Sequence, residues 1–125
     1  MALNYITLLA YSYHMGKQKK LSTEALELVA DRFKILSEPL RLRILHCLQN
    51  GEKSVGDLTE ETGASQPNVS KHLKLLQTSG IVNRRQEGNV VMYSIADDSI
   101  FTLCDLVCGS LSEHLKTRAE VFSGI

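Results

Sequence analysis

The sequence has no net charge, because 14 lysines and arginines balance 14 aspartates and glutamates. A chain of this kind is not suited to indiscriminate binding of polyanions. It also lacks a nucleophile elbow, a phosphate-binding glycine loop and paired carboxylates in a catalytic context, so we expect no enzymatic activity. Internal repeats and low-complexity segments are absent as well. With 43% apolar and 22% charged residues over 125 positions, the chain is predicted to form one globular domain.

Charged residues are missing from the first thirteen positions, which are apolar and aromatic. This stretch lacks the cationic start and the cleavage site of a signal peptide, and it is too short to span a membrane. We therefore expect a cytoplasmic protein with no membrane partner, whose three cysteines are reduced thiols. Residues 1–20 form an N-terminal leader, which is either an extension upstream of a true start at Met15 or an extra helix. The domain is expected at residues 21–118, with a C-terminal tail at 119–125.

What the sequence does contain is a helix-turn-helix pattern near its middle. Ser54 and Asp57 have the spacing of a capping box, which predicts the start of a first helix. Gly63 is suited to the left-handed residue that ends this helix. Ser65 then caps a second helix and Pro67 lies in its first turn, where the missing N–H costs nothing.

The second helix combines one apolar stripe with polar and basic faces. Val69, Leu73 and Leu76 form the stripe at i, i+4 and i+7. On the other faces, amides and hydroxyls are expected to read base edges and cations to hold phosphates. The predicted base readers are Gln66, Asn68 and Ser70. The other predicted DNA contacts of this helix are Ser65, Lys71, His72 and Lys74. An ordinary amphipathic helix with a solvated face is the alternative.

A β-hairpin is predicted directly after this helix. Gly80 ends the helix, and two β-rich segments at 81–85 and 90–95 flank a turn signal at 87–89. Basic side chains at such a tip are placed to grip the DNA backbone or minor groove. The predicted DNA contacts on the hairpin are Arg84, Arg85 and Asn89.

Charge is distributed unevenly along the chain. Residues 64–96 carry four cations and one carboxylate, whereas residues 97–125 carry two cations and five carboxylates. The basic charge therefore lies on the predicted DNA-reading segment.

Three further helices frame this segment. One begins after Ser22, another is opened by Pro39 and ended by Gly51, and the last runs from Asp97 or Asp98 to about residue 118. The apolar face of the first of them is Leu26, Val29, Phe33 and Leu36. The last helix has an apolar stripe that repeats about every 3.5 residues, more than a small domain buries alone, so we assign it to a dimer seam. The predicted interface residues are Leu103, Val107 and Leu111. The predicted fold class is mostly α with a small β-hairpin wing, a winged helix-turn-helix that dimerises through its terminal helices.

These motifs resemble the ArsR/SmtB family of bacterial winged-helix repressors. The resemblance covers about residues 22–118 and is carried by residues 37–45, 54–58, 65–76, 80–82 and 93–95. It implies a homodimeric repressor that leaves its operator when an effector binds. Two recognition helices in a symmetric dimer would read a palindromic operator.

The resemblance also implies where effectors bind. A Cys-x-Cys site on the first helix of the helix-turn-helix is matched here by Ser54 and Gly56, so that site is absent. A second site combines carboxylates and histidines on the last helix. Its matching positions are Asp97, Ser99, Ser110 and Glu113, which keep both carboxylates and lack both imidazoles.

Cys104 and Cys108 remain as effector candidates, at i and i+4 on the last helix, with Cys47 as a third donor. Sulfur ligation of this kind suits a soft metal(loid) ion such as As(III), Sb(III) or Cd(II). The thiols could instead be oxidised as a redox switch, or be small packing residues in the seam. The alternatives to an effector-controlled repressor are a winged-helix protein-interaction module and a regulator without a metal effector.

Overall fold

The computed structural model describes residues 20–115. Its elements are α2 (Thr23–Leu36), α3 (Pro39–Cys47), η1 (Leu48–Asn50), β1 (Lys53–Ser54), α4 (Val55–Thr62), α5 (Gln66–Thr78), β2 (Val82–Glu87), β3 (Val90–Ile95) and α6 (Ser99–His114). Most of the predicted leader, the C-terminal tail and the predicted end of the last helix lie outside the described residues. Within the described part, no helix has the length and apolar character needed to cross a membrane.

The predicted capping signals begin and end the two helices of the helix-turn-helix. Ser54 Oγ accepts from the Asp57 N–H at 3.1 Å, and the Asp57 carboxylate accepts from the Ser54 N–H at 3.2 Å, which completes the capping box of α4. Gly63 ends α4 with a φ of 73°, in the left-handed region. Ser65 Oγ then accepts from the Asn68 N–H at the start of α5. The predicted helix-turn-helix is therefore confirmed.

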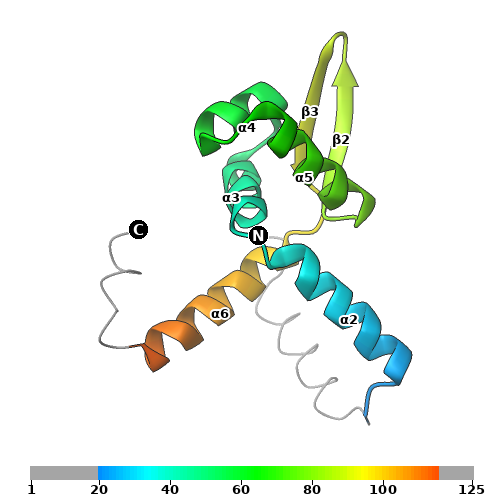
Figure 1. Cartoon of the computed structure of the whole chain (residues 1–125), viewed down its shortest axis with the longest axis vertical. Helices are drawn as coiled ribbons and strands as arrows, with labels where there is room; N and C mark the ends of the chain where they lie inside the picture. The colour runs from blue at the N-terminus through cyan, green and yellow to red at the C-terminus, as the bar shows by residue number, and fades with distance from the viewer. Residues whose placement is uncertain (1–19, 116–125) are drawn as a thin grey trace.

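The wing is part of a three-stranded antiparallel sheet with the order β1-β3-β2. β2 and β3 form the predicted hairpin, which extends beyond the helices in Figure 1. Gly88 has a φ of 62°, and a positive φ at the first central residue alone is the pattern of a type II′ turn. The short strand β1, which pairs Lys53 with Tyr93 and Ser54 with Met92, was not predicted. Two residues are too few to show a strand period in the sequence.

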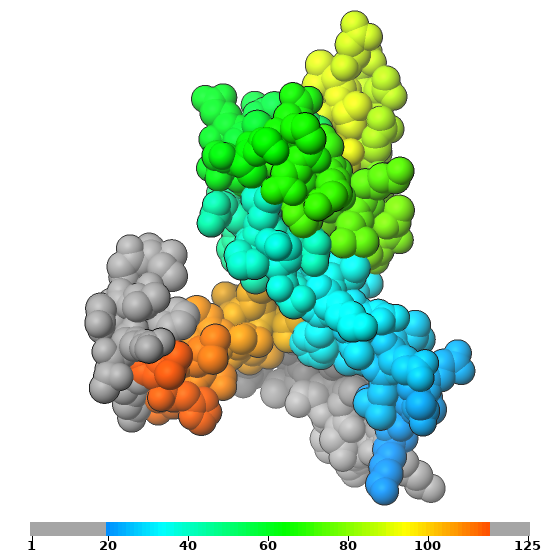
Figure 2. Space-filling model, in the orientation of Figure 1, coloured from blue at the N-terminus to red at the C-terminus, as the bar shows by residue number. Residues whose placement is uncertain are grey.

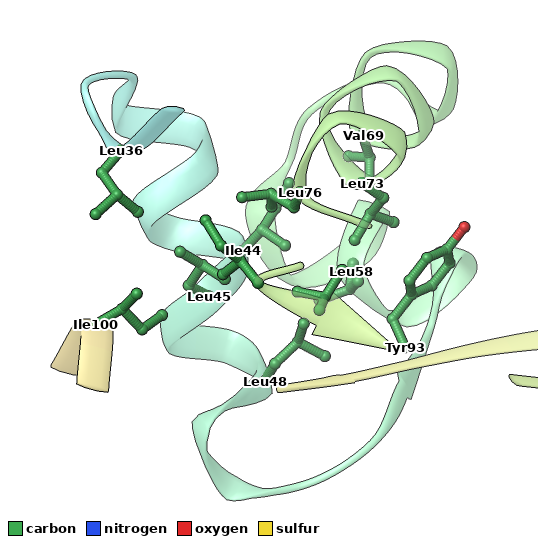
Figure 3. Packing of buried hydrophobic residues seen from close by; sticks show 12 residues of the cluster. Leu36, Ile44, Leu45, Leu48, Leu58, Val69, Leu73, Leu76, Tyr93 and Ile100 are labelled. Carbon is green, nitrogen blue, oxygen red and sulfur yellow. The ribbon is translucent and has the colours of Figure 1, made fainter. Parts of the chain in front are cut away.

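The hydrophobic core lies between α3, α4, α5 and the sheet (Figure 3). Ile44 from α3, Leu58 from α4, and Leu73 and Leu76 from α5 are each 0% exposed. Burial of one such side chain contributes about 1.5–3 kcal/mol. Tyr93 extends this core onto the sheet and is 8% exposed. The core therefore fixes α5 and the wing to one rigid body.

α2 and α6 project away from this body as two limbs (Figures 1 and 2). The predicted apolar face of α2 does not turn to the protomer's own core, because Leu36 alone among its four residues is buried. The limbs expose large apolar side chains that are 37–68% accessible. These are Leu26, Leu28, Val29 and Phe33 on α2, Leu106, Val107 and Leu111 on α6, and Leu115 at the C-cap of α6. Exposed apolar side chains gathered on two helices in this way indicate an interaction site.

Candidate functional site

The polar face of α5 is exposed at its N-terminal end. The exposed residues of this face are Ser65, Gln66, Asn68, Ser70, Lys71 and Lys74. Val69, Leu73 and Leu76 bury the opposite face, so the core sets the rotation of the helix. No salt bridge within residues 20–115 involves Lys71 or Lys74. Both cations are therefore available to an external anion.

The prediction that His72 lies on this DNA-facing surface is wrong. His72 is 7% exposed, and its Nδ1 lies 3.0 Å from Nη1 of Arg41 on α3. It follows Val69 by three residues and precedes Leu76 by four, so helical spacing places it on the apolar stripe. That spacing was the signal in the sequence that could have located it. Burial and the nearby Arg41 guanidinium lower the pKa of His72 below its ordinary value.

The two wing arginines lie on opposite faces of the hairpin. Arg84 is paired with the buried Tyr93, and directly opposed residues in an antiparallel pair project from the same face. Arg84 therefore lies on the same face of the wing as the buried Tyr93. It is exposed and has no salt bridge in the described part of the chain.

Arg85, on the other face, is already paired with carboxylates. Its Nη2 lies 2.7 Å from Glu52 Oε1, its Nε lies 2.9 Å from Glu52 Oε2, and its Nη1 lies 2.7 Å from Glu87 Oε2. The hydrogen bond from Arg85 lowers the pKa of Glu52, and the bonds to Glu52 and Glu87 raise the pKa of Arg85 further above its usual range. Arg85 thus ties β2 to the segment before β1, a pairing that no local sequence pattern predicted. Asn89 is exposed in the turn at the tip of the wing.

Arg32 on α2 connects the limbs to α5. Its Nη2 donates to the carbonyl of Ser79, the C-cap of α5, at 3.1 Å, and its Nη1 lies 3.4 Å from Asp97 Oδ2. Asp97 Oδ1 accepts from the N–H and the hydroxyl of Ser99 at the start of α6. Both oxygens of the Asp97 carboxylate are therefore engaged. The end of the reading helix and the start of α6 share one arginine.

The three cysteines are free thiols in different surroundings. Cys104 is partly buried and Cys108 is exposed, one turn apart on α6. Cys47 is partly buried and packs against the core. Burial raises the pKa of Cys47 and of Cys104, and the charge of Asp105 adds to the rise at Cys104.

A metal site made from one protomer is not assembled in the described residues. Between residues 20 and 115, no three side chains of the histidine, cysteine, aspartate and glutamate types lie together as a metal site. Cys47 therefore does not join Cys104 and Cys108 as the expected third donor within one protomer. Of the three predicted interface residues on α6, Val107 and Leu111 are exposed, whereas Leu103 is partly buried against the protomer's own core.

A helix-turn-helix with an exposed polar reading helix and a basic wing beside it defines a winged-helix DNA-binding protein. The sequence model of the bacterial regulatory protein arsR family matches residues 38–84. Together with the relatives described next, this match shows that the chain belongs to the ArsR family of transcriptional regulators.

Three relatives illustrate the similarity. The uncharacterized HTH-type transcriptional regulator Rv0081 of Mycobacterium tuberculosis is 35% identical over 100 residues, which cover 79% of this chain and 88% of the relative. Its crystal structure has a TM-score of 0.69 and covers 78% of this chain and 99% of its own. The homodimeric winged helix-turn-helix DNA-binding domain of Mb0332 from Mycobacterium bovis is 33% identical, with a TM-score of 0.66 and coverage of 81% and 94%. The antimony-specific transcriptional repressor AntR is 27% identical, with a TM-score of 0.70 and coverage of 80% and 91%.

Proposed function

We propose that this protein is a homodimeric repressor that reads a palindromic operator with α5 and the wing and releases it when an effector binds at the dimer seam. The observation that carries the DNA-reading part is the exposed polar face of α5, next to three cations without salt bridges in the described chain. These cations are Lys71, Lys74 and Arg84.

Base reading and phosphate binding are assigned to different side chains. Gln66, Asn68 and Ser70 are the proposed base readers, because amides and hydroxyls donate to and accept from base edges. Lys71, Lys74 and Arg84 are the proposed phosphate contacts, and Ser65 and Asn89 flank them. Arg85, which was predicted to contact phosphate, is instead proposed to stabilise the wing, because two carboxylates already pair with its guanidinium.

The dimer is proposed to form through the apolar surface of α2 and α6. Leu28 and Leu106 are 65% and 68% exposed, which is costly for apolar side chains that no partner covers. A two-fold pairing of these limbs would bury both surfaces and set the distance between two copies of α5. The similar Mb0332 domain is described as homodimeric, which supports this arrangement.

The effector is proposed to be a thiophilic metal(loid) ion, such as As(III), Sb(III) or Cd(II), bound by Cys104 and Cys108. The raised pKa of Cys104 leaves little thiolate at neutral pH, which slows oxidation. A soft cation is less affected, because it displaces the thiol proton when it binds. Since one protomer supplies two neighbouring thiols on α6, the partner's α6 would supply the remaining donors. The similar repressor AntR is named as antimony-specific.

The test is release of a fluorescent promoter fragment, followed by anisotropy with arsenite, antimonite, Cd²⁺ and peroxide. Cys104→Ser, Cys108→Ser should bind the fragment and fail to release it, while Cys47→Ser should release it like the unmodified protein. Release by peroxide alone would favour a redox switch. Release of the double variant by every inducer that acts on the unmodified protein would leave the cysteines as packing residues.

A further inference from the structure

Arg41 lies at a junction between the outer helix α2 and the reading helix α5. Its Nε donates to the carbonyl of Ile35 at 2.6 Å, and its Nη2 donates to the carbonyl of Lys34 at 3.3 Å. These carbonyls belong to the last turn of α2, where helix carbonyls lack intrahelical partners. The third nitrogen, Nη1, reaches Nδ1 of His72 on α5 at 3.0 Å. One guanidinium therefore connects a limb to the reading helix.

The chemistry of this contact fixes the protonation state of His72. A guanidinium has only donors, so Nδ1 of His72 must accept and the ring proton must lie on Nε2. An imidazolium has no acceptor nitrogen, and it would place a second positive charge about 3 Å from Arg41. The contact exists only while His72 is neutral.

His46 on α3 provides an internal contrast. Its Nδ1 lies 2.8 Å from the carbonyl of Leu42, which can only accept, so Nδ1 of His46 donates. That hydrogen bond persists when the ring is protonated. Both histidines make one hydrogen bond through Nδ1, but protonation breaks the bond of His72 and leaves the bond of His46 in place.

The groups that face His72 favour its neutral form. Arg41 of α3 and Lys71 of α5 are cations that disfavour an imidazolium. Among the described residues, Glu38 at the N-cap of α3 is the carboxylate that favours it. Burial outweighs each of these charges, and the pKa of His72 is lowered. Glu38 also accepts from the Leu40 N–H, so its carboxylate is partly committed to the helix end.

We propose that Arg41 and His72 are positioning residues for DNA binding, which hold α5 against α2 through an acceptor nitrogen and let go when His72 is protonated. The proposal rests on the DNA-reading role of α5. His72 does not touch DNA in this account. It holds the helix whose exposed face carries Gln66 and Asn68. Protonation removes one of the two ties between this helix and α2 and leaves the bond from Arg32 to the Ser79 carbonyl.

The test is anisotropy of a promoter fragment at constant ionic strength from about pH 5.5 to about pH 8, with three variants. For the unmodified protein we expect affinity to fall on acidification, by less than about tenfold for each protomer, because the pKa of His72 is lowered below 6.5 and pH 5.5 is then less than one unit below it. His72→Gln keeps an acceptor oxygen that does not titrate, so its acid-dependent loss should disappear. His72→Ala lacks the acceptor and should bind more weakly than His72→Gln at every pH. His46→Gln should follow the unmodified protein.

A second measurement does not depend on any variant. Histidine ring ¹⁵N shifts of the unmodified protein should show His72 with an acceptor Nδ1 and a protonated Nε2, and His46 with a protonated Nδ1. A protonated Nδ1 on neutral His72, or identical pH profiles for His72→Gln and the unmodified protein, would overturn the proposal. A failure of the unmodified protein to bind the fragment at any pH would instead count against the proposed function.

Discussion

The winged helix-turn-helix and the two limbs differ in how much of their apolar surface one protomer buries. From α3 to β3, apolar side chains at most core positions are only 0–2% exposed. The helix caps, turns and strand pairs of this region also find their hydrogen-bond partners within it. On α2 and α6, apolar residues such as Leu28 and Leu106 are about two-thirds exposed. The DNA-reading region is complete in one chain, whereas the limbs leave apolar side chains exposed that we propose a second copy covers.

The largest expected effect is a loss of stability in the winged helix-turn-helix. Leu73→Ala removes a side chain that is 0% exposed at the centre of the core, and we expect it to lower the free energy of unfolding by about 2–5 kcal/mol. Chemical denaturation followed by circular dichroism measures this. Leu75→Ala on the same helix is the control, because Leu75 is exposed and should cost far less. Equal losses for the two variants would contradict the assigned core.

The next largest expected effect is a loss of dimer affinity when the exposed apolar surface of α6 is changed. Val107→Asp places a carboxylate on the exposed apolar surface of α6, and we expect it to weaken the dimer at least about 100-fold, or about 2.7 kcal/mol. Light scattering after size exclusion should show a folded monomer. Val90→Asp is the matched control, since Val90 is also exposed but lies on the wing. A dimer that survives Val107→Asp would place the seam elsewhere.

Base reading is expected to have a smaller effect. Gln66→Ala removes an exposed amide from the N-terminal turn of α5 and should cost about 1–3 kcal/mol on the cognate site. On unrelated DNA the same variant should bind nearly as well as the unmodified protein. A loss that is the same on both DNAs would show that Gln66 contacts the backbone.

Substitutions of the two wing arginines are expected to differ in how they change the salt dependence of DNA affinity. Arg84→Ala should lower the slope of log affinity against log salt by about two for a dimer, because it removes one phosphate contact from each protomer. Arg85→Ala should change this slope clearly less, because Glu52 and Glu87 already pair with Arg85. The reverse order would mean that the Glu52 pair opens on DNA and that Arg85 makes the contact.

The smallest expected effect is on the pH dependence of stability. The pKa of His72 is lowered in the folded protein from its ordinary 6.5, so the folded state binds fewer protons than the unfolded state. The stability is therefore full above about pH 6.5 and is lost as the pH falls from there toward the folded pKa. The difference in unfolding free energy between about pH 7.5 and 5.5 should be smaller in His72→Gln. An equal difference in both proteins would remove His72 as the cause.

Local signals in the sequence predicted the reading region well. The capping box at Ser54 and Asp57, the left-handed Gly63 and the Ser65 cap each involve residues within four positions of one another, so their chemistry is visible in the sequence. The fold class and the hairpin follow from the same kind of signal.

Long-range pairings were the part that the sequence did not reveal. Arg85 pairs with Glu52 across 33 positions, and Arg41 pairs with His72 across 31, which no local pattern encodes. Strand β1 was missed for the same reason, since its existence depends on β3. His72 differs, because its helical spacing from Val69 and Leu76 already indicated a buried position.

Each protomer forms a complete DNA-reading region, and the two limbs are proposed to join two protomers into one dimer. Sedimentation velocity of the unmodified protein, alone and with a fragment of its own promoter, tests this most directly. We expect a dimer at micromolar concentration and two chains on each palindromic site. A monomer in both conditions, or one chain that binds the fragment with full affinity, would contradict the account.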